Sequence, residues 1–182
     1  IREKKEPKRL PVWACILLFA LGLFVCMGLY GTIGFGLLSL ILGDEARHPG
    51  LLVYTVTEAN MLLSVLTPAV ILLYFERRPF SDLGLTLKGH VRGLWYGLLV
   101  AMLLYLIGFG LSLAIGEVEV TGFQFDPLNL LGTFVFCLLV ALTEEIMMRG
   151  YILGRLLHTR MNKFLALFVS ALLFALLHIF NP

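Results

Sequence analysis

The sequence predicts an all-α, multi-pass membrane protein, a helical bundle of at least five transmembrane helices. Composition is the first reason: 59% of the 182 residues are hydrophobic and 14% are charged, against roughly 45–50% and about 25% in soluble domains. The second reason is that the charges are bunched, which leaves apolar runs of the ~20 residues that a bilayer core requires. The third is a regular alternation of Lys and Arg along the chain. An ordinary soluble domain and a disordered tail are therefore excluded.

Five apolar runs are the predicted helices, in chain order residues 12–43, 51–75, 91–115, 127 to about 158, and 164–180. The glycines of residues 31–36 are expected to loosen the first helix, and Pro68 is expected to kink the second. Pro127 suits the first turn of the fourth helix. Nothing in RGYILGRLLH stops that helix at its first charge. We therefore expect it to continue to about His158 and the chain to turn near Met161.

Basic residues support this layout. Of the 14 Lys and Arg, five precede the first run and one lies in the next loop. Residues 76–92, 116–126 and 149–163, which include charged ends of the apolar runs, hold four, none and four. Because Lys and Arg accumulate on the cytoplasmic side, the N-terminus is predicted to lie in the cytoplasm and the fifth helix to end outside. Residues 1–79 are expected to form a cytoplasmic segment with two leading helices, and residues 80–182 a core. The net charge of +2 carries no information about nucleic acid. The expected partner is the lipid bilayer, and no nucleic-acid partner is expected.

A few polar residues fall inside the apolar runs, where a charge is expensive and usually functional or paired. Glu58 is interpreted as a structural or interfacial carboxylate, and Asn60 as an interhelical hydrogen-bonding group. Glu145 and Arg149 are four residues apart with the acid first, the better order for an ion pair on a helix. This pairing leaves Glu144 about 100° further round the helix without a local counter-charge. From the spacing alone, a solvated salt bridge and a functional site are equally good interpretations.

His178 gives Glu144 a candidate partner. Each of the two lies 17 residues from Met161, the expected turn. In an antiparallel hairpin, equal separation means equal depth, here about 25 Å from the turn. Phe174 and Ser170 lie on the same helix face as His178. Two ionisable groups that meet inside a membrane are a candidate functional site.

Such a pair points to hydrolysis of an acyl bond. A carboxylate at Glu144 can take a proton from water as a general base, and His178 can orient the water or stabilise an oxyanion. Two groups fall short of the three protein ligands usual for catalytic zinc, so no cofactor is expected and zinc is disfavoured. The sequence has no H-E-x-x-H, no G-x-S-x-G and no intramembrane aspartate pair. The cysteines lack metal-ligand spacing and are interpreted as packing residues: Cys15, Cys26 and Cys137.

The two motifs at these positions are E-E-x-x-x-R over residues 144–149 and F-x-x-x-H over residues 174–178. Together with their flanks, RGYILGRLL and SALLFALLH, and with the earlier FSDLGLTLKG, they make residues 80–182 resemble the CAAX prenyl protease and bacteriocin-processing (CPBP, or Abi) family of intramembrane glutamic endopeptidases. The resemblance implies a CPBP/Abi-type bundle in which Glu144 activates water and His178 positions it. Glu145, Arg149 and Phe174 would be supporting residues. The implied substrates are membrane-associated peptides or proteins, including prenylated CAAX proteins, and the expected source is bacterial.

The family carries a further histidine with Asn or Asp four residues later, and this chain ends before such a motif. We therefore expect either a fragment or a shortened member. This leaves open a second function, a catalytically inactive bacteriocin-immunity or membrane scaffold protein on the same fold. A substrate or ion carrier is a third, although no inverted repeat or pair of broken helices supports it.

Overall fold

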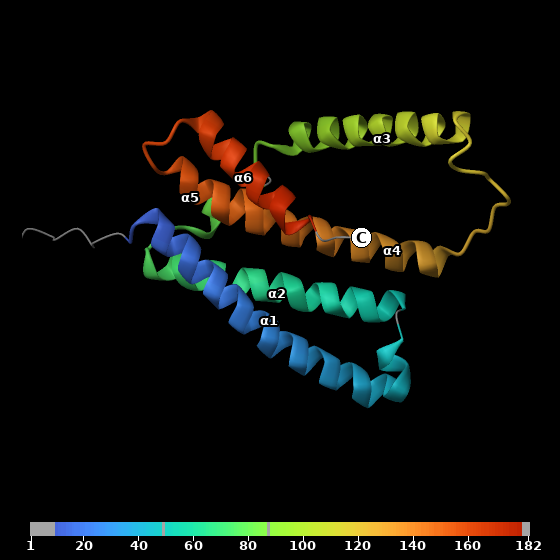
Figure 1. Cartoon of the computed structure of the whole chain (residues 1–182), viewed down its shortest axis with the longest axis horizontal. Helices are drawn as coiled ribbons and strands as arrows, with labels where there is room; N and C mark the ends of the chain where they lie inside the picture. Colours follow the sequence, from blue (N-terminus) through green and yellow to red (C-terminus); the bar gives the residue numbers. More distant parts are fainter. Residues whose placement is uncertain (1–9, 49, 87, 180–182) are drawn as a thin grey trace, which may run out of the picture. The chain divides into compact units, whose positions relative to one another are not determined.

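The computed structural model of the chain describes residues 10–48, 50–86 and 88–179 (Figure 1). All regular secondary structure within these residues is helical. Among the described residues, four helical segments are long and apolar enough to cross a membrane: Val12–Arg47, Leu51–Phe75, Val91–Ala114 and Pro127–Leu157. The predicted all-α membrane fold is therefore confirmed.

The helices follow the predicted runs closely. The α-helices of the described residues are α1 (Val12–Leu42), α2 (Leu51–Phe75), α3 (Val91–Ala114), α4 (Pro127–Glu144), α5 (Gly154–Leu157) and α6 (Lys163–Leu177). Of these, α5 is a short continuation of the run that begins with α4. The π-helical segment η3 (Glu145–Leu153) joins α4 to α5 without a break. Two 3₁₀ turns complete the set, η1 (Gly43–Arg47) and η2 (Phe80–Leu83).

The chain forms two compact units. One unites the parts before Thr86 and after Pro127, and it contains α1, α2 and the run from α4 to α6. The other is Thr86–Pro127, which contains α3. No residue of α3 is buried within the described chain, and its side chains are mostly apolar, as expected of a helix surface that faces lipid.

Helices α1 and α2 pack closely through small residues. A Cβ atom on Gly22 would lie 2.7 Å from Cβ of Pro68, and one on Gly34 would overlap the side chain of Asn60. The expected loosening at residues 31–36 is wrong, because α1 is continuous through this stretch. Glycine is tolerated in membrane helices and lets backbones approach, so these glycines favour close packing without ending the helix. Helix α2 likewise continues through Pro68.

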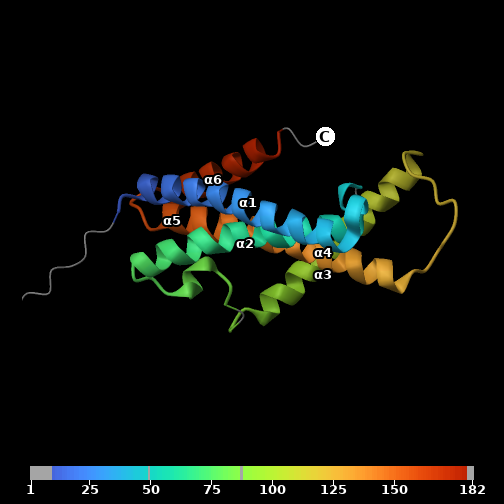
Figure 2. The ribbon, with the colours of Figure 1, turned by 90° about the horizontal axis from the view of Figure 1, so that it is seen from below.

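The C-terminal part is a helical hairpin. The helix that begins with α4 ends at Leu157, the chain turns over residues 158–162, and α6 folds back along η3 (Figures 1 and 2). The side chain of Asn162 caps α6 by accepting a hydrogen bond from the backbone nitrogen of Phe164 at 2.8 Å. The turn near Met161 is thus confirmed. With 15 residues, α6 is an apolar helix shorter than the four spanning segments, and residue 180 of the predicted fifth span lies outside the described residues.

The core of the larger unit lies where this hairpin meets the leading helices. Tyr151 and Phe19 are buried there, with their rings stacked at a centroid distance of 4.3 Å. Val65, Ala69 and Leu73 of α2 belong to the same buried cluster. The predicted helix to about residue 158 is correct in extent, but its middle is π-helical rather than α-helical. This middle segment carries the candidate site.

Candidate active site

Glu144 and His178 meet across the hairpin. Glu144 is the last residue of α4, and His178 directly follows α6 as its C-cap. Nε2 of His178 lies 3.2 Å from Oε1 of Glu144, and each side chain is about one-third exposed, at 34% and 35%. The equal depth predicted from the sequence thus places the two groups in contact.

A second contact fixes how His178 presents its ring. Nδ1 lies 2.9 Å from the backbone oxygen of Phe174, one helical turn earlier. A carbonyl oxygen only accepts, so Nδ1 carries a hydrogen and donates it. The Phe174 ring packs against the imidazole at a centroid distance of 4.3 Å. Nε2 is therefore the nitrogen that faces Glu144.

This geometry requires a shared proton. In a neutral ring with a hydrogen on Nδ1, Nε2 presents a lone pair, and an ionised carboxylate also presents only lone pairs. A hydrogen bond at 3.2 Å between Glu144 and His178 therefore needs one proton, carried by either partner. Such a pair can exchange a proton with a bound water, which is the requirement for general acid–base chemistry.

Glu145 and Arg149 form the ion pair that their spacing predicts. Nη1 of Arg149 lies 2.7 Å from Oε1 and 2.9 Å from Oε2 of Glu145, and both side chains are exposed. Arg149 thus neutralises Glu145, and Glu144 has His178 as its partner. The two adjacent glutamates have different partners and different exposure, although the sequence presents them side by side.

A cavity of about 190 Å³ lies beside these residues, between η3 and α6. It is lined by Glu144, Glu145, Arg149 and Ser170 among polar residues, and by Met148, Leu153, Leu167, Ala171 and Phe174. A water molecule occupies roughly 30 Å³ in the liquid, so the cavity has room for water and a small part of a peptide. Its lining combines two carboxyl groups, a guanidinium and a hydroxyl with apolar walls.

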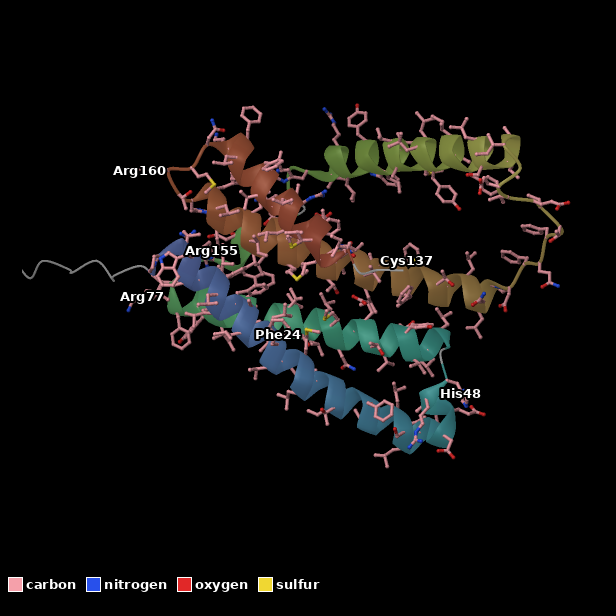
Figure 3. The ribbon with its side chains drawn as sticks, in the orientation of Figure 1. Phe24, His48, Arg77, Cys137, Arg155 and Arg160 are labelled. Atoms are coloured by element: carbon pink, nitrogen blue, oxygen red, sulfur yellow. The ribbon has the colours of Figure 1, made fainter. Side chains whose placement is uncertain are left out.

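The other polar residues of the apolar runs lie elsewhere. Glu58 and Asn60 line a separate cavity of about 410 Å³ between α1 and α2. The cysteines are not grouped, and Cys137 is exposed on α4 (Figure 3). Cys15 is more than a packing residue, because its thiol donates a hydrogen bond to Oε1 of Glu76 at 2.8 Å. Among the described residues, no three His, Cys, Asp or Glu side chains are close enough to hold a metal ion together.

Sequence reasoning missed the π-helical segment and its contacts. Ser170 on α6 donates a hydrogen bond to the backbone oxygen of Met148 at 3.3 Å, inside the segment. Gly150 packs so closely on η2 that a Cβ atom there would lie 2.6 Å from the backbone oxygen of Leu83. The position of Ser170 on the face of His178 was a usable signal. No sequence signal indicated the change from α to π geometry, because the apolar residues of the segment fit both helical periods.

A comparison with known protein families matches the part of the chain that contains the two motifs. Residues 126–182 match the family model described as type II CAAX prenyl endopeptidase, Rce1-like. This match contains Glu144 and His178, and it is shorter than the 80–182 of the predicted resemblance. Neither the curated proteins nor the solved structures gave a match to the chain. Residues 126–182 are therefore similar to the Rce1-like type II CAAX prenyl endopeptidases of the CPBP family, a family of helical membrane proteins.

Proposed function

We propose that this protein is an intramembrane endopeptidase that hydrolyses peptide bonds of membrane-associated or prenylated CAAX-type substrates with water activated by Glu144. The observation that carries the proposal is the contact between Glu144 and His178 at 3.2 Å, at the edge of a cavity shared by η3 and α6. Glu145, Arg149 and Phe174 are supporting residues in this proposal. No cofactor is required by the steps below.

The shared proton assigns the starting state. When His178 carries it, Glu144 is ionised and can remove a proton from a water molecule while the water oxygen bonds to the substrate's carbonyl carbon. The imidazolium can then donate to the oxyanion that forms. Glu144 next gives its proton to the leaving amine as the carbon–nitrogen bond breaks. Both groups return to their starting states, so the step balances without another reactant.

The supporting residues act on geometry. The backbone oxygen of Phe174 holds Nδ1 of His178 at 2.9 Å, which keeps Nε2 directed at Glu144. The ion pair between Glu145 and Arg149 removes Arg149 as a competing partner for Glu144. A carboxylate that keeps a titratable partner is suited to proton transfer. A carboxylate that is paired with a permanent cation is less suited to proton transfer.

The basic residues support a direction in the membrane. Arg77, Arg155 and Arg160 lie at the end of the larger unit opposite to His48 (Figure 3). We propose that this end faces the cytoplasm, with the N-terminus on the same side, in the plasma membrane. A fluorescent reporter that matures only in the cytoplasm, fused before Val12, is expected to fluoresce. A dark but fully expressed fusion would reverse the proposed orientation.

The mechanism is tested with Glu144→Gln, and Glu145→Gln is the matched control. The full chain, reconstituted in liposomes, is given an internally quenched CAAX peptide with and without a prenyl group. Loss of a general base typically slows a reaction by about 10²–10⁴-fold, so Glu144→Gln is expected to lower kcat/KM by at least about 100-fold. Glu145→Gln removes the same charge from the next residue and is expected to cost far less.

Cleavage by Glu144→Gln at the parent rate would rule out this mechanism. If the parent protein cleaves neither peptide, the protease proposal fails for these substrates. The non-enzymatic role on the same fold would then be favoured, provided that cells are protected from a bacteriocin and that Glu144→Gln with His178→Ala keeps this protection.

A further inference from the structure

The change from α to π geometry separates two side chains that an unbroken helix would align. Glu144 and Arg155 are eleven residues apart, and an α-helix would place such residues within about 20° of each other around its axis. A π-helix bonds i to i+5 and so has more residues per turn. In the structure the two contact different neighbours: Glu144 reaches His178 beside α6, and Arg155 reaches Glu76 at the end of α2.

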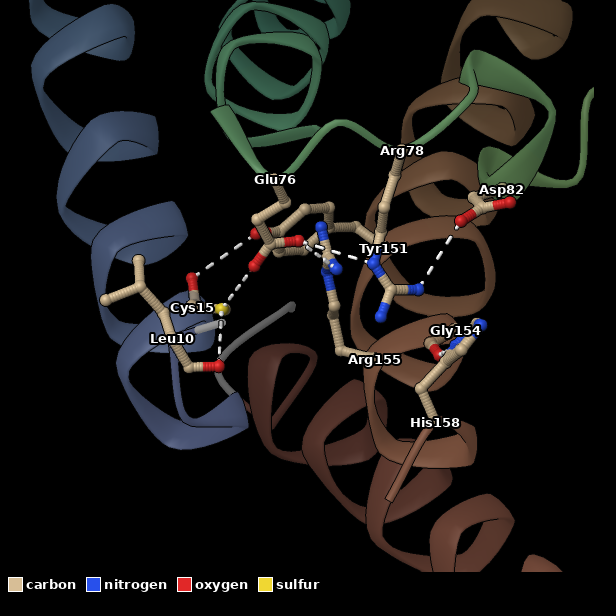
Figure 4. A network of polar contacts seen from close by, with 9 residues as sticks. All are labelled: Leu10, Cys15, Glu76, Arg78, Asp82, Tyr151, Gly154, Arg155 and His158. Carbon is tan, nitrogen blue, oxygen red and sulfur yellow. Dashed lines mark hydrogen bonds and ion pairs between the residues drawn. The ribbon is translucent and has the colours of Figure 1, made fainter. Parts of the chain in front are cut away.

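Arg155 is buried in a polar network (Figure 4). Its side chain is 5% exposed and pairs with Oε2 of Glu76, which is 9% exposed. Nε of Arg78 lies 3.5 Å from the same oxygen, and the thiol of Cys15 donates to the other. The network therefore joins the helix of Glu144 to the start of α1 and the end of α2.

Tyr151 provides a second attachment one turn before Arg155. It is 1% exposed and donates a hydrogen bond to the backbone oxygen of Cys15 at 3.4 Å. Its ring stacks on Phe19 at a centroid distance of 4.3 Å, and the guanidinium of Arg155 lies 5.0 Å from the ring centroid. Two attachments one turn apart on the same helix resist rotation about the helix axis, which a single contact would not.

The π-helical segment is held from its other sides as well. Ser170 of α6 donates to the oxygen of Met148, and Gly150 allows the backbone of η2 to approach at Leu83. Hydrogen bonds from α1 and α6 and a close approach of η2 therefore hold the segment. The rotation of the segment sets where its first residues point, and Glu144 immediately precedes it.

We propose that Glu76, Tyr151 and Arg155 are positioning residues, which fix the rotation of the π-helical segment and thereby aim Glu144 at His178. The inference rests on the proposed function, in which the alignment of Glu144 and His178 determines the rate. These residues touch neither the cavity of the site nor its reacting groups. Tyr151 lies about two turns and Arg155 about three turns from Glu144 along one continuous helix, and Glu76 acts through Arg155.

The cost of the network argues for this role over simple stabilisation. A buried ion pair is often no more stabilising than apolar residues of the same volume, because both charges lose their hydration. Nη2 of Arg155 is also buried without a hydrogen-bond partner among the described residues, which adds to that cost. In some proteins such a pair specifies a single geometry, and a catalytic glutamate requires one.

The test compares Arg155→Met, which keeps the length and loses the charge, with Arg155→Lys, which keeps the charge. Arg160→Met is the control, since Arg160 is exposed at the same end of the helix. Misplacement by about 1 Å can cost up to about 100-fold in rate. We expect Arg155→Met to lower kcat by about 10-fold to 100-fold with little change in KM, Arg155→Lys to recover part of it, and Arg160→Met to match the parent.

A second measurement does not depend on cleavage. A protein without its native cysteines (Cys15→Ser, Cys26→Ala, Cys137→Ala) receives two new ones, Glu144→Cys and His178→Cys. A short bifunctional methanethiosulfonate then joins the two new thiols. Adding Arg155→Met is expected to reduce the cross-linked fraction several-fold, while Arg160→Met leaves it unchanged. Unchanged cross-linking would overturn the positioning role, even if cleavage falls. A different outcome would be that Arg155→Met reduces cross-linking while Glu144→Gln leaves cleavage normal. The positioning role would then be retained and the proposed function rejected.

Discussion

Two regions of the molecule pack their helices in different ways. One is the leading pair, α1 with α2, and the other is the site hairpin, which runs from α4 to α6. In the leading pair both helices keep α geometry, and their contacts along the helices include close approaches at Gly22 and Gly34 and a hydroxyl pair, Tyr30 with Thr67 at 2.9 Å. In the site hairpin one helix leaves α geometry, and polar groups from its neighbours contact it.

The difference shows where a membrane helix can carry chemistry. A regular α-helix satisfies its own backbone, so its neighbours need only fit its shape. A π-helical stretch alters the hydrogen-bond pattern and is frequently found at functional sites. The hairpin uses this: a serine on α6 reaches a backbone oxygen in the stretch, and the same two helices bring a glutamate and a histidine together.

The largest expected effect comes from breaking the site hairpin at His178. His178→Gln removes the group that shares a proton with Glu144, so kcat/KM is expected to fall by about 100-fold or more. His158→Gln is the matched control, because Nδ1 of His158 also contacts the backbone oxygen four residues earlier, at 2.6 Å, yet this ring is exposed in the turn. Equal losses in the two variants would show that the hairpin needs the helix-end hydrogen bond and not the acid–base pair.

Much of this comparison was predictable from the sequence. The lengths of the apolar runs, with Pro127 at a helix start, predicted the helices to within a few residues. The equal separation of Glu144 and His178 from Met161 predicted their contact, because depth in a hairpin depends only on counting residues. These features are local or follow from one turn, so they do not require knowledge of how the helices pack.

The parts that were missed depend on packing. Arg155 was counted among the cytoplasmic basic residues, and Glu76 was taken as part of a connecting segment. In the structure they form a buried pair, although 79 residues separate them in the sequence. No pattern within either segment indicates this partner. The π-helical geometry of Glu145–Leu153 escaped for a related reason, since its contacts come from Ser170 and Leu83 in other elements.

One substitution, glycine to alanine, sharpens the comparison at a smaller scale. In the site hairpin, Gly150→Ala would place a methyl group 2.6 Å from the backbone oxygen of Leu83, whereas at Gly154 the nearest atom is 3.5 Å away, an ordinary contact. Overpacking typically costs about 1–3 kcal/mol. Gly150→Ala is therefore expected to lower both thermal stability and kcat, and Gly154→Ala to be tolerated in both.

In the leading pair the same substitution is expected to separate stability from activity. Gly22→Ala would place its methyl group 2.7 Å from Cβ of Pro68, while Gly28 has no neighbour within 4 Å among the described residues. Gly22→Ala is expected to cost about 1–3 kcal/mol, and Gly28→Ala to be neutral or to gain up to about 1 kcal/mol of helix propensity. Because α1 and α2 keep regular geometry far along the chain from Glu144, kcat per folded molecule should stay near the parent value in both. Thermal unfolding and kcat, measured on the same liposome preparations, test whether Gly22→Ala lowers stability without lowering kcat. A loss of kcat in Gly22→Ala as large as in Gly150→Ala would mean that the leading pair determines the site geometry as strongly as the π-helical segment does, and the contrast between the two regions would then fail.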